Sequence, residues 1–134
     1  MRIALVVPLV LIAAACQRTL PEQDRRITVT PAMAKVPAED LWKEYQANAK
    51  AADKKYWGNA IEVSGKVSTV VGDPASPVAV RFLIERDKGI EAFVLDDQAA
   101  TVLRTASVGQ RLRLKCFCAG LNEDVILRSC IPLQ

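Results

Sequence analysis

The segment Ile61-Glu62-Val63-Ser64-Gly65-Lys66-Val67-Ser68-Thr69 has the most regular pattern in the chain. Apolar or small residues at 61, 63, 65 and 67 alternate with polar residues at 62, 64, 66 and 68. Because successive side chains of a strand point to opposite faces, this alternation predicts a half-buried β-strand over residues 61–69. One face of the strand then contributes to a core, and the other is polar.

Four further strands are predicted downstream, together with a short helix over residues 96–106. The strands cover residues 78–84, 90–95, 110–118 and 125–131. Turn residues such as Gly72-Asp73-Pro74 and Asp87-Lys88-Gly89 separate the first three strands of the domain, and an aspartate caps the short helix. The resulting order, β-β-β-α-β-β, is that of a mainly β, five-stranded OB-fold barrel. An open α+β sandwich with the same elements is the alternative.

An α-helix is predicted upstream of the barrel, over residues 38–56. Apolar and small residues recur there at spacings of three and four, which places them on one stripe of a helix. They are Leu41, Tyr45, Ala49, Ala52 and Tyr56. Gly58 and Asn59 provide the helix stop. The folded domain is therefore expected to span residues 38–134.

Residues 1–15 have the composition of a secretory signal peptide. Arg2 precedes a short apolar run from residue 3 to residue 12, and three alanines follow. The run is too short for a spanning helix, which needs roughly 20 residues. Cys16 directly after the small residues is typical of a bacterial lipoprotein, so we expect cleavage before Cys16 and attachment of acyl chains to it.

The lipid on Cys16 makes the membrane a partner of the protein. Gln17 stands where an aspartate would favour retention at the inner membrane, so we expect the outer membrane, facing the periplasm. Residues 16–37 contain several prolines and mixed charges without a sustained period. This composition predicts a flexible tether, which if extended would hold the domain tens of ångströms from the bilayer.

Composition excludes several classes of catalytic site. The chain of 134 residues contains no histidine, which rules out histidine-based catalysis and histidine metal ligands. The adjacent acids Asp96-Asp97 and Glu123-Asp124 lie where a helix cap and a turn require them, not across a cleft. Four cysteines include one for lipidation, and no fourth metal ligand accompanies the other three. We therefore expect no enzyme, no metal site and no cofactor.

The chain resembles the anticodon-binding-like (tRNA_anti-like) OB-fold family of small bacterial proteins, many of them lipoproteins. The resemblance covers roughly residues 38–132. It is carried by Leu41, Tyr45, Asn48, Ala52 and Tyr56, then Val63-x-Gly65-x-Val67, Gly109-Gln110, Cys118-x-Gly120 and Val125-x-Leu127-x-x-Cys130. It implies an OB barrel with an N-terminal helix and a disulfide between Cys118 and Cys130. It brings no catalytic residues and no established ligand.

The pairing of the cysteines depends on the last hairpin. A turn centred near Asp124 places Cys118 opposite Cys130, and a turn one or two residues earlier brings Cys116 nearer to Cys130. The sequence leaves both registers open. In either case the spacing is not Cys-x-x-Cys, so a structural disulfide is favoured over a redox pair.

Candidate binding residues are basic and aromatic side chains expected on the outer surface of the barrel. They are Arg81, Phe93, Arg111, Arg113, Lys115 and Phe117, together with Trp42 on the helix as a contact for a protein partner. Aromatics can anchor interfaces, and basic groups beside aromatics can bind single-stranded nucleic acid. Since the net charge is only +3, we expect a noncatalytic binding or interaction module with an envelope partner. Nucleic-acid binding on the barrel face is the alternative.

Overall fold

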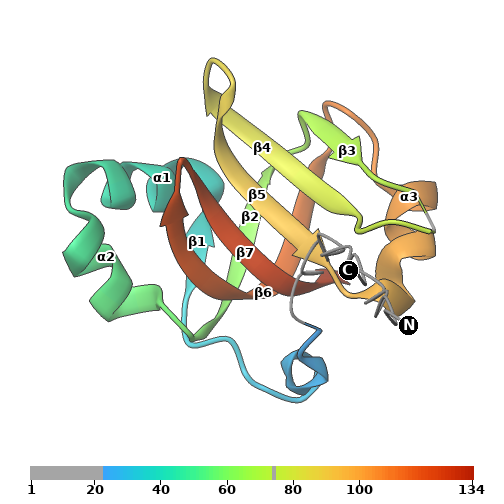
Figure 1. Cartoon of the computed structure of the whole chain (residues 1–134), viewed down its shortest axis with the longest axis horizontal. Coiled ribbons are helices and arrows are strands. Elements are labelled where there is room, and N and C mark those ends of the chain that lie inside the picture. Colours follow the sequence, from blue (N-terminus) through green and yellow to red (C-terminus); the bar gives the residue numbers. More distant parts are fainter. Residues whose placement is uncertain (1–22, 74) are drawn as a thin grey trace, which may run out of the picture.

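The computed structural model describes residues 23–73 and 75–134, and its main feature is a curved seven-stranded sheet (Figure 1). The strands are β1 (Lys35–Pro37), β2 (Ala60–Lys66), β3 (Thr69–Val71), β4 (Ala79–Glu85), β5 (Lys88–Val94), β6 (Arg111–Asn122) and β7 (Asp124–Leu133). The helices are α1 (Ala38–Ala47), α2 (Ala49–Tyr56) and α3 (Ala99–Thr105), with short 3-10 helices η1 (Arg25–Thr28) and η2 (Asp96–Gln98). From β2 onward the predicted element order is confirmed, except that β3 is an additional strand.

The predicted strand over residues 61–69 is two strands joined by Val67 and Ser68. The Val67 N–H donates to the Gln110 carbonyl at 2.9 Å, and the Ser68 N–H donates to the Arg81 carbonyl at 2.9 Å. The chain thus changes partner from β6 to β4 within two residues. This bend curls the sheet, although its hydrogen-bonded order runs from β1 at one edge to β3 at the other: β1-β2-β6-β7-β5-β4-β3.

The prediction of a closed, mainly β, five-stranded barrel is therefore corrected. The fold is mixed, with three α-helices on a seven-stranded open sheet, and closure into a barrel is not seen. Both additional strands have clear causes. One arises from the bend between β2 and β3, and the other is β1, which pairs in parallel with β2.

The predicted helix over residues 38–56 is divided at Asn48. Asn48 has an extended backbone (φ −163°), and its side chain accepts a hydrogen bond from the Ala51 N–H at 3.1 Å. An asparagine in this position competes with the helix backbone and starts a new helix, which gives α1 and α2. Four members of the predicted apolar stripe, Leu41, Tyr45, Ala52 and Tyr56, are buried, and the fifth, Ala49, is partly buried against the same core. Within the described residues no helix has the length and apolar character needed to cross a bilayer.

The core lies between the helices and the concave side of the sheet. Helix α1 contacts β2, β4 and β5, and α3 contributes Ala99 and Val102. Gly65 allows this close packing, since a Cβ there would lie 2.9 Å from the Ala38 Cβ and 2.9 Å from a Phe82 ring carbon. The glycine at the centre of the alternating segment is therefore a site of helix–sheet contact.

Part of the predicted tether over residues 16–37 belongs to the folded domain, so that prediction is corrected from residue 23 onward. Residues 25–28 form η1, and β1 extends the sheet. Ile27 is fully buried in a small cluster with Ala60, Leu95 and Phe117. Burying an isoleucine stabilises a fold by about 1.5–3 kcal/mol, so this segment is fixed mainly by its apolar contact.

The disulfide joins Cys116 to Cys130, and the prediction of a Cys118–Cys130 bridge is wrong. The hairpin turn is centred on Glu123, whose φ of 62° is left-handed, with Asn122 paired to Asp124. This turn places Lys115 opposite Ile131, and register shifts on either side of Cys118 set it opposite Leu127. Cys116 and Cys130 meet with their Cα atoms 4.2 Å apart, well within the limit for a bridge.

Candidate binding face

The outer surface of β2 and β6 is built from two cross-strand pairs of charged residues. The strands are antiparallel, and their register places Lys66 opposite Arg111 and Glu62 opposite Lys115. Because side chains alternate along a strand, the neighbours of these residues point inward, and Val63 and Leu114 are fully buried. The alternation that forms the core thus also gathers the charges on the opposite face.

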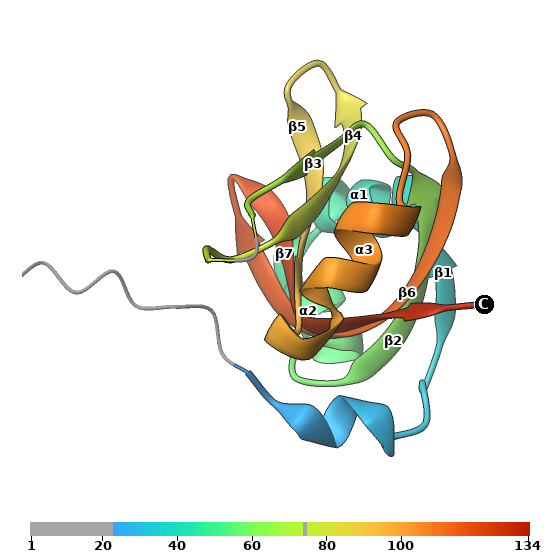
Figure 2. The ribbon, with the colours of Figure 1, turned by 90° about the vertical axis from the view of Figure 1, so that its right-hand side faces the viewer.

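We call this surface the basic face. It comprises Lys35 on β1, Glu62, Ser64 and Lys66 on β2, and Arg111, Arg113 and Lys115 on β6. Within these described strands, the face carries five cationic side chains and one carboxylate, that of Glu62. Figure 2 shows β1, β2 and β6 together on one side of the molecule, with no helix over their outer surface.

The charges at the Glu62 end of the basic face are partly neutralised. Arg113 Nη1 lies 3.1 Å from Glu62 Oε1, and Lys35 Nζ lies 3.9 Å from Glu62 Oε2. Arg113 also donates to a main-chain oxygen of Gln134. The carboxylate therefore has two cationic partners, and it is only slightly exposed.

The other end of the basic face carries like charges without a counter-charge. Lys66 and Arg111 are directly opposite each other, and both are exposed. Neither they nor Lys115 form an ion pair with any residue that the structure describes. Like charges in direct cross-strand contact cost about 0.2–1 kcal/mol, and a bound anion would relieve that repulsion.

Arg81 and Phe93 lie on a different surface, formed by β4 and β5. Arg81 Nη2 lies 3.0 Å from Asp124 Oδ2 and donates to the Asp87 carbonyl at 3.1 Å. Asp124 also accepts from the Gly89 N–H at 3.0 Å. Arg81 thus holds two turns together, and its side chain is only 26% exposed. It is not brought together with the cations of the basic face.

Trp42 and Phe117 are not surface residues, so both are corrected as candidate contacts. Trp42 is 2% exposed, because α1 buries Ala38, Leu41, Trp42 and Tyr45 as one continuous stripe. Phe117 follows Lys115 on β6, but it is 8% exposed and packs against Ile27 of η1. The cover comes from η1, in the segment that precedes the N-terminal helix.

The exposed tryptophan is Trp57, which is 59% accessible at the end of α2. One edge of its ring lies against Gly120, where an added Cβ would come within 3.3 Å of Trp57 Cδ1. Leu121 beside it is also exposed. Trp57 pairs with Cys118, and Leu121 pairs with Val125 near the hairpin turn. Both therefore lie farther along β6 than the charged residues of the basic face.

Cys118 is a buried free thiol in the seam between the helices and β6. Its Sγ lies 3.3 Å from the Tyr45 hydroxyl, which donates to Asp53 Oδ1 at 2.9 Å. Burial raises the pKa of the Cys118 thiol, and the hydrogen bond between Cys118 and Tyr45 opposes that rise only in part. The thiol therefore stays protonated at neutral pH, which suits a structural residue and not a nucleophile.

Sequence reasoning missed Lys35, Glu62 and Lys66 as members of the face. The alternation indicated that Glu62 and Lys66 point outward, but it did not identify the strand opposite them. Cys16 and the predicted signal peptide lie outside the described residues. Among residues 23–73 and 75–134, no group of histidine, cysteine or acidic side chains could hold a metal ion.

Comparisons with known proteins agree with the fold. The sequence model of the tRNA_anti-like family matches residues 1–131. A crystal structure of a "putative nucleic acid-binding lipoprotein" from Klebsiella pneumoniae superposes with a TM-score of 0.57 at 12% sequence identity. The superposition covers 84% of this chain and 99% of that one, which shows a shared, OB-like fold. No curated protein matches the sequence.

Proposed function

This chain belongs to the tRNA_anti-like family, and from that premise we propose that it is a noncatalytic binding domain of the bacterial cell envelope. Its anchor is the lipid on Cys16, which holds it at the outer membrane facing the periplasm. The sequence of residues 1–16 supports the anchor. The Klebsiella pneumoniae protein that shares the fold is described as a lipoprotein, which is in keeping with it.

The ligand-binding surface that we propose is the basic face, and the ligand is anionic. The observation that carries this proposal is the opposed pair Lys66 and Arg111, which has no acidic partner among the described residues. A surface that places like charges together is less stable alone than with an anion bound. An acidic surface of an envelope protein is the partner class that fits best.

Single-stranded nucleic acid is the second candidate ligand. The alternate residues Arg111, Arg113 and Lys115 form a row of cations spaced about 7 Å apart along β6. Such a row can follow a phosphate backbone. However, the described residues of β1, β2 and β6 hold one aromatic side chain, Phe117, and it is buried. Binding would therefore depend on charge and not on base stacking.

A salt series on the mature chain, with Cys16→Ser to remove the lipid site, tests an anionic ligand. Fluorescence anisotropy would follow its binding to a labelled oligothymidine and to labelled polyglutamate. With four cations engaged, oligothymidine affinity should fall about 50-fold between 50 and 200 mM salt. Similar affinities and salt dependences for both polymers would support recognition of charge, whereas binding of oligothymidine without binding of polyglutamate would favour nucleic acid as the ligand. No binding of either polymer at low salt would overturn the proposal.

A further inference from the structure

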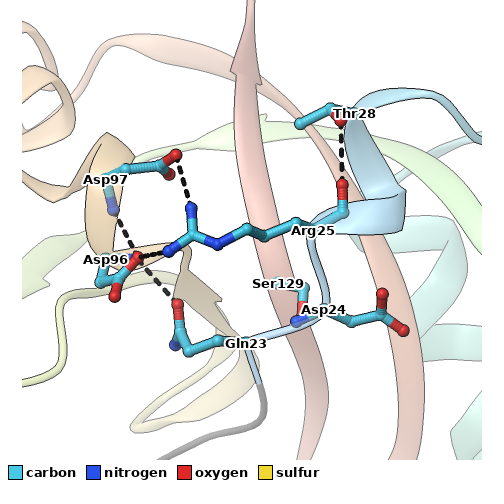
Figure 3. Close-up of polar contacts among 7 residues, drawn as sticks. All are labelled: Gln23, Asp24, Arg25, Thr28, Asp96, Asp97 and Ser129. Carbon is cyan, nitrogen blue, oxygen red and sulfur yellow. Dashed lines mark hydrogen bonds and ion pairs between the residues drawn. The ribbon is translucent and has the colours of Figure 1, made fainter.

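The N-terminal strap, which we define as residues 23–33, is joined to the domain by main-chain hydrogen bonds at its beginning. The Asp24 N–H donates to Ser129 Oγ at 2.9 Å, and the Asp96 N–H donates to Gln23 Oε1 at 2.8 Å. Figure 3 shows Gln23 and Asp24 lying between η2 and the strand that carries Ser129. The chain is therefore fixed to the domain from the first residue that the structure describes.

The strap is also clamped by an arginine between two acids. Arg25 Nη2 lies 2.9 Å from Asp96 Oδ1, and Arg25 Nη1 lies 2.8 Å from Asp97 Oδ2 (Figure 3). All three side chains are more than half exposed, so this contact orients the strap more than it stabilises it. The Asp96 carboxylate therefore accepts from Arg25, and the Asp96 main-chain N–H donates to Gln23 of the strap.

Apolar contact and sheet pairing complete the attachment. Ile27 is completely buried against Phe117 and Leu95. Beyond η1, the Met33 N–H donates to the Ala60 carbonyl at 2.9 Å, immediately before β1 joins the sheet. Contacts thus run along the whole strap, from its beginning at η2 to its end at β2.

The strap shortens the link between the domain and the proposed lipid. Seven peptide steps separate Cys16 from Gln23, and they span at most about 25 Å. A tether that lasted until α1 would span at most about 80 Å. The point of attachment is Gln23, whose side chain accepts from the Asp96 N–H of η2. In Figure 2 the described chain begins at the lower left of the molecule, and β1 and β2 lie to its right.

We propose that the docked strap orients the domain on the membrane. The side formed by η2 and α3 lies toward the lipid surface, and the basic face points away from it, toward partners in the periplasm. This inference rests on the lipid anchor of the proposed function. It explains why the segment after the lipid site is packed across the domain, where a flexible tether would let the basic face turn toward the bilayer.

The orientation can be measured on the full lipidated chain in phospholipid vesicles that contain acceptor-labelled lipid. A donor dye is attached through an unnatural amino acid at Ala100, an exposed residue of α3, or at Lys66 on the basic face. A domain of this size is about 30–35 Å across, so energy transfer from position 100 is expected to exceed that from position 66 about twofold or more.

Releasing the strap should remove this difference. Ile27→Asp places a charge in the buried cluster, and Arg25→Glu sets a third acid beside Asp96 and Asp97. In both variants the energy-transfer efficiencies from positions 100 and 66 are expected to become similar. Arg25→Glu tests the strap without altering a core residue. Lys54→Glu, on an exposed position of α2, is the matched charge reversal and should leave the difference unchanged.

Each outcome bears on a different claim. Equal energy transfer from positions 100 and 66 in the unaltered chain would contradict the orientation. In the strap variants, cleavage by trypsin after Arg26 shows that the strap is released. A transfer difference that persists in a variant with a released strap would also contradict the orientation. Protein that does not float with the vesicles would overturn the anchor and the orientation together. Absence of binding to either polyanion at low salt would overturn the ligand class and leave the orientation standing.

Discussion

Replacing Trp42 with alanine is expected to lower the free energy of unfolding by about 3–5 kcal/mol. Trp42 is buried in the main cluster beside Leu41 and Tyr45, where α1 packs on the sheet. Removal of the indole leaves a cavity that the neighbouring side chains can fill only in part. Urea unfolding followed by far-UV circular dichroism measures the change.

Trp57→Ala provides the contrast for this experiment, because the Trp57 side chain is largely exposed. Its loss should cost about 0.5–1 kcal/mol. Trp42→Phe should fall between the two, since a phenylalanine keeps part of the ring contact. Equal destabilisation by Trp42→Ala and Trp57→Ala would contradict the burial of Trp42 and would restore it as a candidate surface contact.

Loss of the Cys116–Cys130 bridge is expected to destabilise the protein by about 3 kcal/mol. The bridge closes a loop with a sequence separation of 14 residues, and it ties β6 to β7. The double variant Cys116→Ala/Cys130→Ala tests this by urea unfolding. Cys118→Ala removes only a buried free thiol and is the matched control, with an expected cost of about 1 kcal/mol.

A non-reducing digest identifies the pairing independently. Cleavage after Lys115, Phe117 and Arg128 leaves Cys116, Cys118 and Cys130 on three separate fragments, and the fragment with Cys116 should be linked to the one with Cys130. In native Cys16→Ser protein, Cys118 should resist alkylation until denaturant is added, because its thiol is buried with a raised pKa. A fragment joining Cys118 to Cys130 would contradict the hairpin register.

Local periodicity was sufficient to predict most elements of the fold. The period of two over residues 61–67 and the spacing of Leu41, Tyr45, Ala52 and Tyr56 depend only on which side of a strand or helix a residue occupies. Both patterns correspond to buried positions in the structure. The order of elements after β2 followed from the turn residues between them.

What the sequence could not provide were contacts set by distant partners. The bend at Val67 and Ser68 depends on hydrogen bonds to Gln110 and Arg81, which lie far away in the chain. Ile27 looks like part of a linker until the pocket made by Phe117 and Leu95 is known. In the hairpin, a shift of one residue in the turn centre changed the partner of Cys130.

The candidate site was predicted in part for the same reason. Alternation along β6 placed Arg111, Arg113 and Lys115 on one face, and the structure brings them together with Lys66. Trp42 was misplaced although a signal existed, since Ala38, Leu41, Trp42 and Tyr45 have the i, i+3, i+4, i+7 spacing of a buried stripe. Phe117 shared the outward alternation of the three cations, and only tertiary structure shows its cover.

The most direct test of the account is oligothymidine affinity at about 50 mM salt in the double variant Lys66→Glu/Arg111→Glu. Its control is Lys50→Glu/Lys54→Glu, two exposed lysines of α2 whose reversal changes the net charge equally. Binding through the basic face predicts a loss of about tenfold or more in the first variant and about twofold or less in the second. Equal losses in both variants would show that net charge governs binding, and the basic face would not be a binding site.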